Sequence, residues 1–76
     1  MNLTTLGANQ TVITLANGDQ VFYSYNTPVA AFISGRGFVR TEEKHSSTTS
    51  KHINKWSRVY NETLSQSFFD NLVKTA

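Results

Sequence analysis

The sequence predicts an α+β domain in which a small three- or four-stranded antiparallel sheet packs against one amphipathic helix and a short C-terminal helix. The chain has 76 residues, of which 38% are hydrophobic, so it can enclose one core but not two, and we expect residues 1–76 to form a single domain. Residues 9–41 are β-rich, because Val, Ile, Thr, Phe and Tyr dominate there and turn residues interrupt them. Residues 47–75 are predicted to be helical, because their apolar positions recur with a helical period.

The first two strands are predicted to form a hairpin around Asn17-Gly18. The runs on either side, residues 11–16 and 19–26, both have the composition of strands. An Asn-Gly pair favours a type I′ turn, which needs a positive φ at both central residues.

The rest of the β-rich half is less uniform. Thr27-Pro28 interrupts the ladder, because proline donates no N–H. Residues 29–33 fit either a third strand or a short helix. After a tight turn at residues 35–37, residues 38–41 are predicted to form another short strand.

The helix expected near residues 50–60 has two distinct faces. Its apolar stripe consists of Thr49, Ile53, Trp56 and Tyr60. Its basic stripe consists of Lys51, Lys55 and Arg58. At 100° per residue the two stripes lie on opposite sides, so the apolar one should pack on the sheet and the basic one should face solvent. The hydroxyl-rich residues 46–50 supply several candidate N-caps.

A short C-terminal helix follows. Ser65 is its expected cap, with Leu64 and Phe69 forming a hydrophobic staple. Its buried face is predicted to consist of Phe68, Phe69, Leu72 and Val73.

Positive charge is concentrated in the middle of the chain. The net charge is +2, but six of the seven basic residues lie within residues 36–58: Arg36, Arg40, Lys44, Lys51, Lys55 and Arg58. With Glu42 and Glu43 in the same window, this segment carries +4 and the remainder of the chain −2. Such a segment favours contact with phosphates or with an acidic protein surface, so we expect these six residues to bind a macromolecule.

The start of the predicted helix is a candidate anion site made of Thr48, Ser50, Lys51 and His52. Positive side chains in a first turn oppose the helix macrodipole, and a bound anion would relieve that repulsion. The alternative is that the hydroxyls only cap the helix and the lysines are solvated.

The sequence carries no recognisable catalytic or cofactor motif. It has no cysteine, hence no disulfide, thiolate zinc site or thiol nucleophile. The turn at residues 34–37 is not a nucleophile elbow, and no glycine loop has the spacing of a dinucleotide or Walker motif. His45 and His52 are better read as exposed or capping residues than as metal ligands. We expect no enzyme activity, no cofactor and no metal.

The sequence contains nine aromatic residues, and it does not decide which face of the sheet is exposed to solvent. Tyr23 and Tyr25 alternate onto one face of the second strand and could stack on a ligand. In so small a sheet we expect them in the core instead. An exposed tyrosine face would indicate a protein partner.

The segment from residue 17 to residue 56 resembles small bacteriophage proteins of an uncharacterised domain family. The similarity lies in the Asn-Gly turn, Tyr-x-Thr-Pro-Val-Ala-Ala at 25–31, Gly-x-Gly-Phe-x-Arg-Thr at 35–41 and Thr-Thr-Ser-Lys-His-Ile-Asn-Lys-Trp at 48–56. This resemblance implies a phage origin and expression inside a bacterial cell. It implies no catalytic or binding residues.

Together these features predict a non-enzymatic, phage-type interaction protein that docks on a host or phage macromolecule through residues 36–58. The partner would be a protein or a nucleic acid, and the alternative function is a nucleic-acid-binding module that contacts phosphates through the helix at 50–60. No apolar run is long enough to span a bilayer and no signal peptide is visible, so we expect a location in the cytoplasm of the host cell, without membrane contact. A core of this size is worth only about 3–5 kcal/mol, which leaves a homo-oligomer open.

Overall fold

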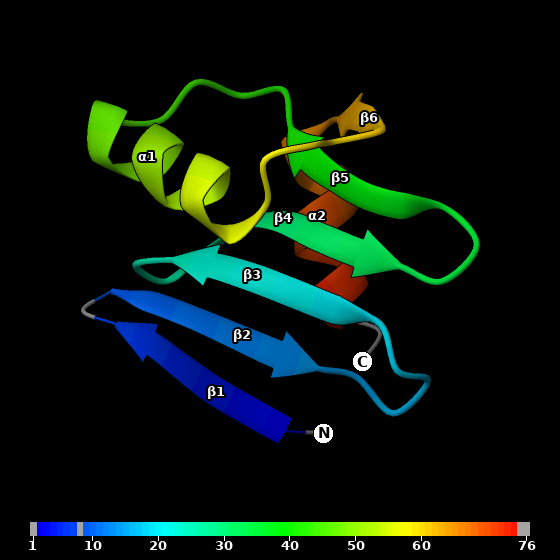
Figure 1. Ribbon diagram of the computed structural model, residues 1–76. Coiled ribbons are helices and arrows are strands. Elements are labelled where there is room, and N and C mark those ends of the chain that lie inside the picture. Colours follow the sequence, from blue (N-terminus) through cyan, green and yellow to red (C-terminus); the bar gives the residue numbers. More distant parts are fainter. Residues whose placement is uncertain (1, 8, 75–76) are drawn as a thin grey trace.

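The computed structural model, which describes residues 2–7 and 9–74, contains a six-stranded mixed sheet and two helices (Figure 1). The strands are β1 (Asn2–Gly7), β2 (Gln10–Thr14), β3 (Gln20–Ser24), β4 (Thr27–Ile33), β5 (Gly37–Thr41) and β6 (Glu62–Leu64), and the helices are α1 (Ser47–Trp56) and α2 (Gln66–Lys74). The strands lie in sequence order across the sheet, and every neighbouring pair is antiparallel except β5 and β6. The predicted three- or four-stranded antiparallel sheet is therefore wrong in strand number and in strand direction.

The parallel pair at one edge explains why α1 lies between β5 and β6 in the sequence. A parallel neighbour cannot be reached through a tight turn, so the chain needs a long crossover, and helices usually supply it. Here residues 42–61 form that crossover, and Val39 to Thr41 pair with Glu62 to Leu64.

The β2–β3 hairpin is confirmed, but its turn differs from the predicted type I′. Thr14 pairs with Gln20, and the Gly18 N–H donates to the Leu15 carbonyl at 3.0 Å. Gly18 has φ +93°, whereas Asn17 has no positive φ. This is the longer hairpin connection in which a turn is followed by one left-handed glycine. The Asn17 side chain instead accepts a hydrogen bond from the Asp19 N–H at 3.0 Å.

Residues 29–33, for which strand and helix were both open, belong to β4. Pro28 fits in this strand beside an irregularity, because the β3–β4 register shifts between Phe22 and Tyr23 and Tyr23 then pairs with Pro28. Bulges are where a sheet accepts a residue without an N–H.

The two helices cover opposite faces of the sheet, with α1 in front and α2 behind it in Figure 1. On the α1 face, Ile53 packs in one cluster with Val12, Phe22, Val29 and Ala30. On the other face, Phe69 of α2 packs with Ala31 and Val39. The centre of the sheet is thus buried on both sides, and consecutive strand residues such as Val21 and Phe22 are both inaccessible to solvent.

The helices start close to their predicted positions, but α1 ends earlier. Ser46 is the N-cap of α1, and its Oγ accepts a hydrogen bond from the Thr49 N–H at 3.2 Å. The helix ends at Trp56, so Tyr60 lies outside it and donates its hydroxyl hydrogen to the Ile53 carbonyl. α2 begins directly after Ser65, and Leu64 packs against the cluster that holds Phe69, as the predicted staple requires.

Among the described residues, neither helix combines the length and the hydropathy that a membrane span requires.

Candidate macromolecule-binding surface

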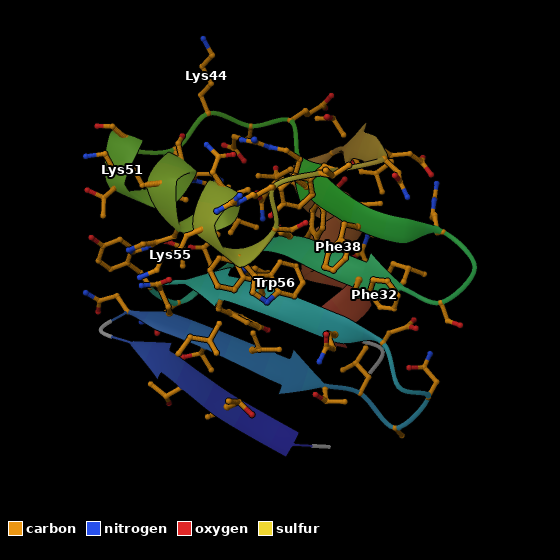
Figure 2. All side chains as sticks on the ribbon, viewed as in Figure 1. Phe32, Phe38, Lys44, Lys51, Lys55 and Trp56 are labelled. Atoms are coloured by element: carbon orange, nitrogen blue, oxygen red, sulfur yellow. The ribbon has the colours of Figure 1, made fainter. Side chains whose placement is uncertain are left out.

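The outer side of α1 carries unbalanced positive charge. Lys51 and Lys55 are exposed, stand one turn apart, and belong to a helix whose sequence contains no acidic residue. Arg58 is exposed just beyond the helix end, and Lys44 is exposed on the loop before it. Figure 2 shows the lysines along α1 and on that loop. We call Lys51, Lys55 and Arg58 the basic face.

The two predicted arginines from the strand half are placed differently. Arg36, at the β4–β5 turn, forms a double hydrogen bond with the Glu62 carboxylate, through Nε at 2.9 Å and Nη2 at 3.2 Å. The hydrogen bond from Arg36 holds the pKa of Glu62 below its usual value. The guanidinium also lies over the Phe68 ring of α2, 5.5 Å from its centroid. Arg36 therefore already has a partner and is not part of the basic face.

Arg40 remains on the α1 side of the sheet. Its guanidinium lies over the ring of Tyr60, 5.7 Å from the centroid. Cations over aromatic rings in this way are held at a defined position. Arg40 thus joins the basic residues to a group of aromatic side chains.

These aromatic side chains form a row on the sheet face beside the end of α1. Its members are Phe32, Phe38, Trp56 and Tyr60, which are all half-buried. We call them the aromatic row. Phe32 and Phe38 are opposite each other on β4 and β5, with ring centroids 4.9 Å apart, and Trp56 stacks on the buried Phe22 at 5.1 Å.

The row stays partly open because α1 stops at Trp56 and does not extend over β5. Figure 2 shows Trp56 under the helix end, with Phe38 and Phe32 beyond it along the sheet. Phe38 meets Trp56 edge-on, with centroids 5.3 Å apart, and meets Tyr60 edge-on at 6.4 Å. The aromatic row therefore begins at the residue that follows Lys55 in the chain, and Arg40 lies over its Tyr60 ring.

Tyr23 and Tyr25, expected in the core, lie elsewhere. Tyr25 is 48% exposed and sits in the turn after β3, and Tyr23 is half-buried. Both line a shallow hollow on the face opposite Phe22, together with Leu3 and Ile13. The tyrosines thus belong to a different surface from the aromatic row.

The four residues of the predicted anion site lie in different surroundings. Thr48 and Lys51 are exposed on the surface. Ser50 borders a cleft of about 540 Å³ between α1 and residues 40–45. His52 faces the sheet, where its Nδ1 lies 2.8 Å from the Ser24 Oγ. The structure does not bring these side chains together around one point.

The contact between Ser24 and His52 was missed by the sequence analysis. The Ser24 hydroxyl also donates to the Thr49 Oγ1 at 3.1 Å, so it bridges two residues of α1. A serine beside a histidine suggests a nucleophile, but Ser24 is only 2% exposed and its Oγ is closed to a substrate. The contact therefore anchors α1 on β3.

His45, the second histidine, also has a hydrogen-bond partner. Nε2 of His45 lies 3.1 Å from the Gln66 Oε1, which also accepts a hydrogen bond from Thr41. The Gln66 amide nitrogen in turn donates to the Pro28 carbonyl at 2.7 Å. In the part of the chain that the structure describes, no three His, Cys, Asp or Glu side chains gather as a metal site would require.

Tyr60 should make folding stability sensitive to alkaline pH. Burial raises the pKa of its hydroxyl to about 12, although the charge of Arg40 acts in the opposite direction. The folded state thus prefers the neutral phenol, and this stabilisation is complete below the unfolded value near 10 and is lost as pH rises from there through about 12. Urea denaturation between these pH values should show the decline. Tyr60→Phe should decline less steeply, and equal slopes in the two proteins would contradict the assignment.

Comparison with known proteins gives a family and no relative of known activity. No curated protein and no solved structure matches the chain. The family model that matches is described as a family of unknown function, DUF8033, and it covers residues 1–71. The match extends well beyond residues 17–56, where the sequence resemblance was found. The chain therefore belongs to this family of unknown function.

Proposed function

We propose that the protein is a non-enzymatic binding module that docks on another macromolecule through the α1 side of its sheet. The observation that supports this is the exposed basic face beside a half-open aromatic row. Of the predicted residues 36–58, the α1 part carries the contact and Arg36 does not. The partner that this surface fits best is a single-stranded nucleic acid.

The chemistry of single strands fits both halves of the surface. Lysines and arginines contact phosphates and release counterions, and unpaired bases stack on aromatic rings whatever their sequence. An acidic protein would also satisfy the basic face, and aromatic side chains anchor protein interfaces as well, but a row of rings beside cationic side chains matches the alternating bases and phosphates of a single strand. Stacking contributes about 1–3 kcal/mol per base, so even one or two open rings matter.

The non-enzymatic part of the proposal is supported by how the reactive side chains are engaged. The buried Ser24 contacts the half-buried His52, and His45 contacts Gln66. Glu62 holds Arg36. Catalytic groups need an open path to a substrate, whereas the Ser24 hydroxyl is closed to solvent and the other groups are engaged by side chains of their own protein.

The proposal includes the setting that the sequence resemblance implies, namely a phage-encoded protein acting in the cytoplasm of a bacterial cell. In that setting the macromolecule is a host or phage nucleic acid, or a host or phage protein. The test below separates these two classes of partner.

Binding to fluorescent single-stranded oligonucleotides should be measured by anisotropy at several salt concentrations. We expect salt-sensitive binding that weakens at least tenfold in the double variant Lys51→Gln/Lys55→Gln. The slope of log affinity against log salt should fall by about 1.4, because each lost phosphate contact removes about 0.7 on a single strand. The variant Ala16→Glu/Ser67→Glu changes the net charge equally at exposed sites on a turn and on α2, and it should bind like the wild type.

Phe32→Leu tests the aromatic row separately. It keeps the apolar packing but removes a flat ring, so affinity should fall while the salt slope stays the same. Absence of oligonucleotide binding at low salt would overturn the nucleic-acid partner. An effect of the charge-matched control as large as that of the α1 variant would overturn the proposed surface.

A further inference from the structure

The two edges of the sheet differ in how they are protected against association. Outer strands present unpaired N–H and C=O groups, and soluble proteins usually shorten, charge, bend or cover them. At one edge, β6 has three residues and carries Glu62, which is tied to Arg36. At the other edge, β1 has six residues and, within residues 2–7 and 9–74, pairs only with β2.

β1 lacks the usual protective features. Its sequence, Asn-Leu-Thr-Thr-Leu-Gly, contains no charged residue and no proline. Its register with β2 is regular from Asn2 to Thr5, and the irregularity lies only beyond that point, before Gly7. Leu3 is 66% exposed and Leu6 50% exposed, so the strand shows apolar side chains as well as free backbone groups.

We propose that β1 pairs antiparallel with β1 of a second copy of this chain, so that one sheet continues through both molecules. The absence of charge on β1 favours a second copy of the chain as the partner. The chain carries a net +2, which opposes self-association in general, but two β1 strands bring no charged side chains together. An uncharged strand gives no reason to prefer a charged partner, and it is self-complementary.

Symmetry fixes the register to two choices. A two-fold axis perpendicular to the sheet keeps each face on its own side, so it must pass midway between one residue of β1 and the same residue of the second copy, which then face each other. The exposed residues at the centre of β1 are Thr4 and Thr5, and Thr–Thr is a favourable cross-strand pair. With the axis at Thr4, five residues of each strand pair, and Leu3 lies opposite Thr5 of the second copy.

This register also covers the exposed leucine. Leu3 pairs with Ile13 on β2, and the two line a hollow of about 240 Å³ with Thr11, Tyr23 and Tyr25. Across the axis, Leu3 of one copy and Leu3 of the other are diagonal neighbours, close enough for side-chain contact. The two hollows then meet along the joined edge.

The pairing also has a consequence for the proposed function. Because the axis keeps each face on its own side, both copies present α1 and the aromatic row on the same side of the continuous sheet. A single strand that spans the two copies would bind bivalently. The pairing itself rests on β1 alone, and its test uses no nucleic acid.

Sedimentation equilibrium from micromolar to near-millimolar protein tests the pairing. The wild type should show a reversible dimer. Thr4→Lys and Thr4→Glu should each raise the dissociation constant at least about tenfold, because like charges would face each other across the axis. An equimolar mixture of the two variants should restore the dimer. Thr48→Lys, an equal charge change at an exposed threonine of α1, should leave the dimer unchanged.

The mixing step protects the result against misfolding, because two unfolded variants would not restore each other. If the corresponding Lys and Glu changes at Thr5 show the rescue instead, the axis lies at Thr5 and the pairing stands. A wild type that stays monomeric at all concentrations would overturn the proposal. A dimer that neither set of variants weakens would also overturn it, because it would use another surface.

Discussion

Replacing Phe69 by alanine is expected to lower the free energy of unfolding by about 3–5 kcal/mol. The side chain is fully buried and packs α2 against Ala31 and Val39 on the rear face of the sheet. Removing it leaves a cavity next to two small or short residues that cannot fill the space. A core of this size is worth only about 3–5 kcal/mol, so the variant should be partly unfolded at room temperature.

The adjacent Phe68 provides a matched control on the same helix. It is half-buried, its ring centroid lies 5.2 Å from that of Phe69, and the Arg36 guanidinium lies over its ring. Phe68→Ala should cost clearly less, about 1–2 kcal/mol, because part of its surface is already in water. Urea denaturation followed by circular dichroism gives both values. Similar losses for the two variants would contradict the placement of Phe69 at the centre of this cluster.

Phe69 also illustrates which features local sequence could predict. The helical spacing of apolar residues placed it on the buried face of a helix, and Leu64 before Ser65 marked where that helix begins. The same reasoning found the hairpin around Asn17-Gly18. These features depend on residues a few positions apart, so short segments of the sequence are enough to predict them.

The two outer strands could not be predicted in this way. β1 shows no clean alternation of apolar and polar residues, and it becomes a strand by pairing with β2. β6 has only three residues, and its partner Val39 to Thr41 lies more than twenty positions earlier. Pairing over such distances is decided by tertiary structure, which is why the predicted sheet was too small and lacked its parallel pair.

The candidate site was predicted in the same uneven way. Helical periodicity correctly separated Lys51 and Lys55 from the buried Ile53. Proximity in sequence grouped Arg36 with them, but the β4–β5 turn carries Arg36 to Glu62. The aromatic row depends on where α1 ends and on the β4–β5 register. Short-range sequence patterns determine neither of these.

Gly37→Ala is expected to cost about 2–3 kcal/mol for two separate reasons. Gly37 has φ +90°, a conformation that costs an L-residue about 1–2 kcal/mol. In addition, a Cβ at this position would lie 2.0 Å from the Asn61 Nδ2. The Asn61 side chain would have to move and give up its hydrogen bond to the Arg36 carbonyl, now 3.1 Å long, which is worth about 1 kcal/mol.

Gly35→Ala separates the two causes, because Gly35 has φ +81° but an added Cβ there would meet nothing within 4 Å. It should show only the backbone cost, about 1–2 kcal/mol. Adding Asn61→Ala to Gly37→Ala should bring little further loss, because the clash has already broken the Asn61 hydrogen bond. The free energies of unfolding of the three variants, measured in urea, therefore separate the backbone cost from the cost of the clash with Asn61. If Gly37→Ala and Gly35→Ala lose the same amount, the Asn61 side chain does not hold the start of β6 against β5 in the way its contacts indicate.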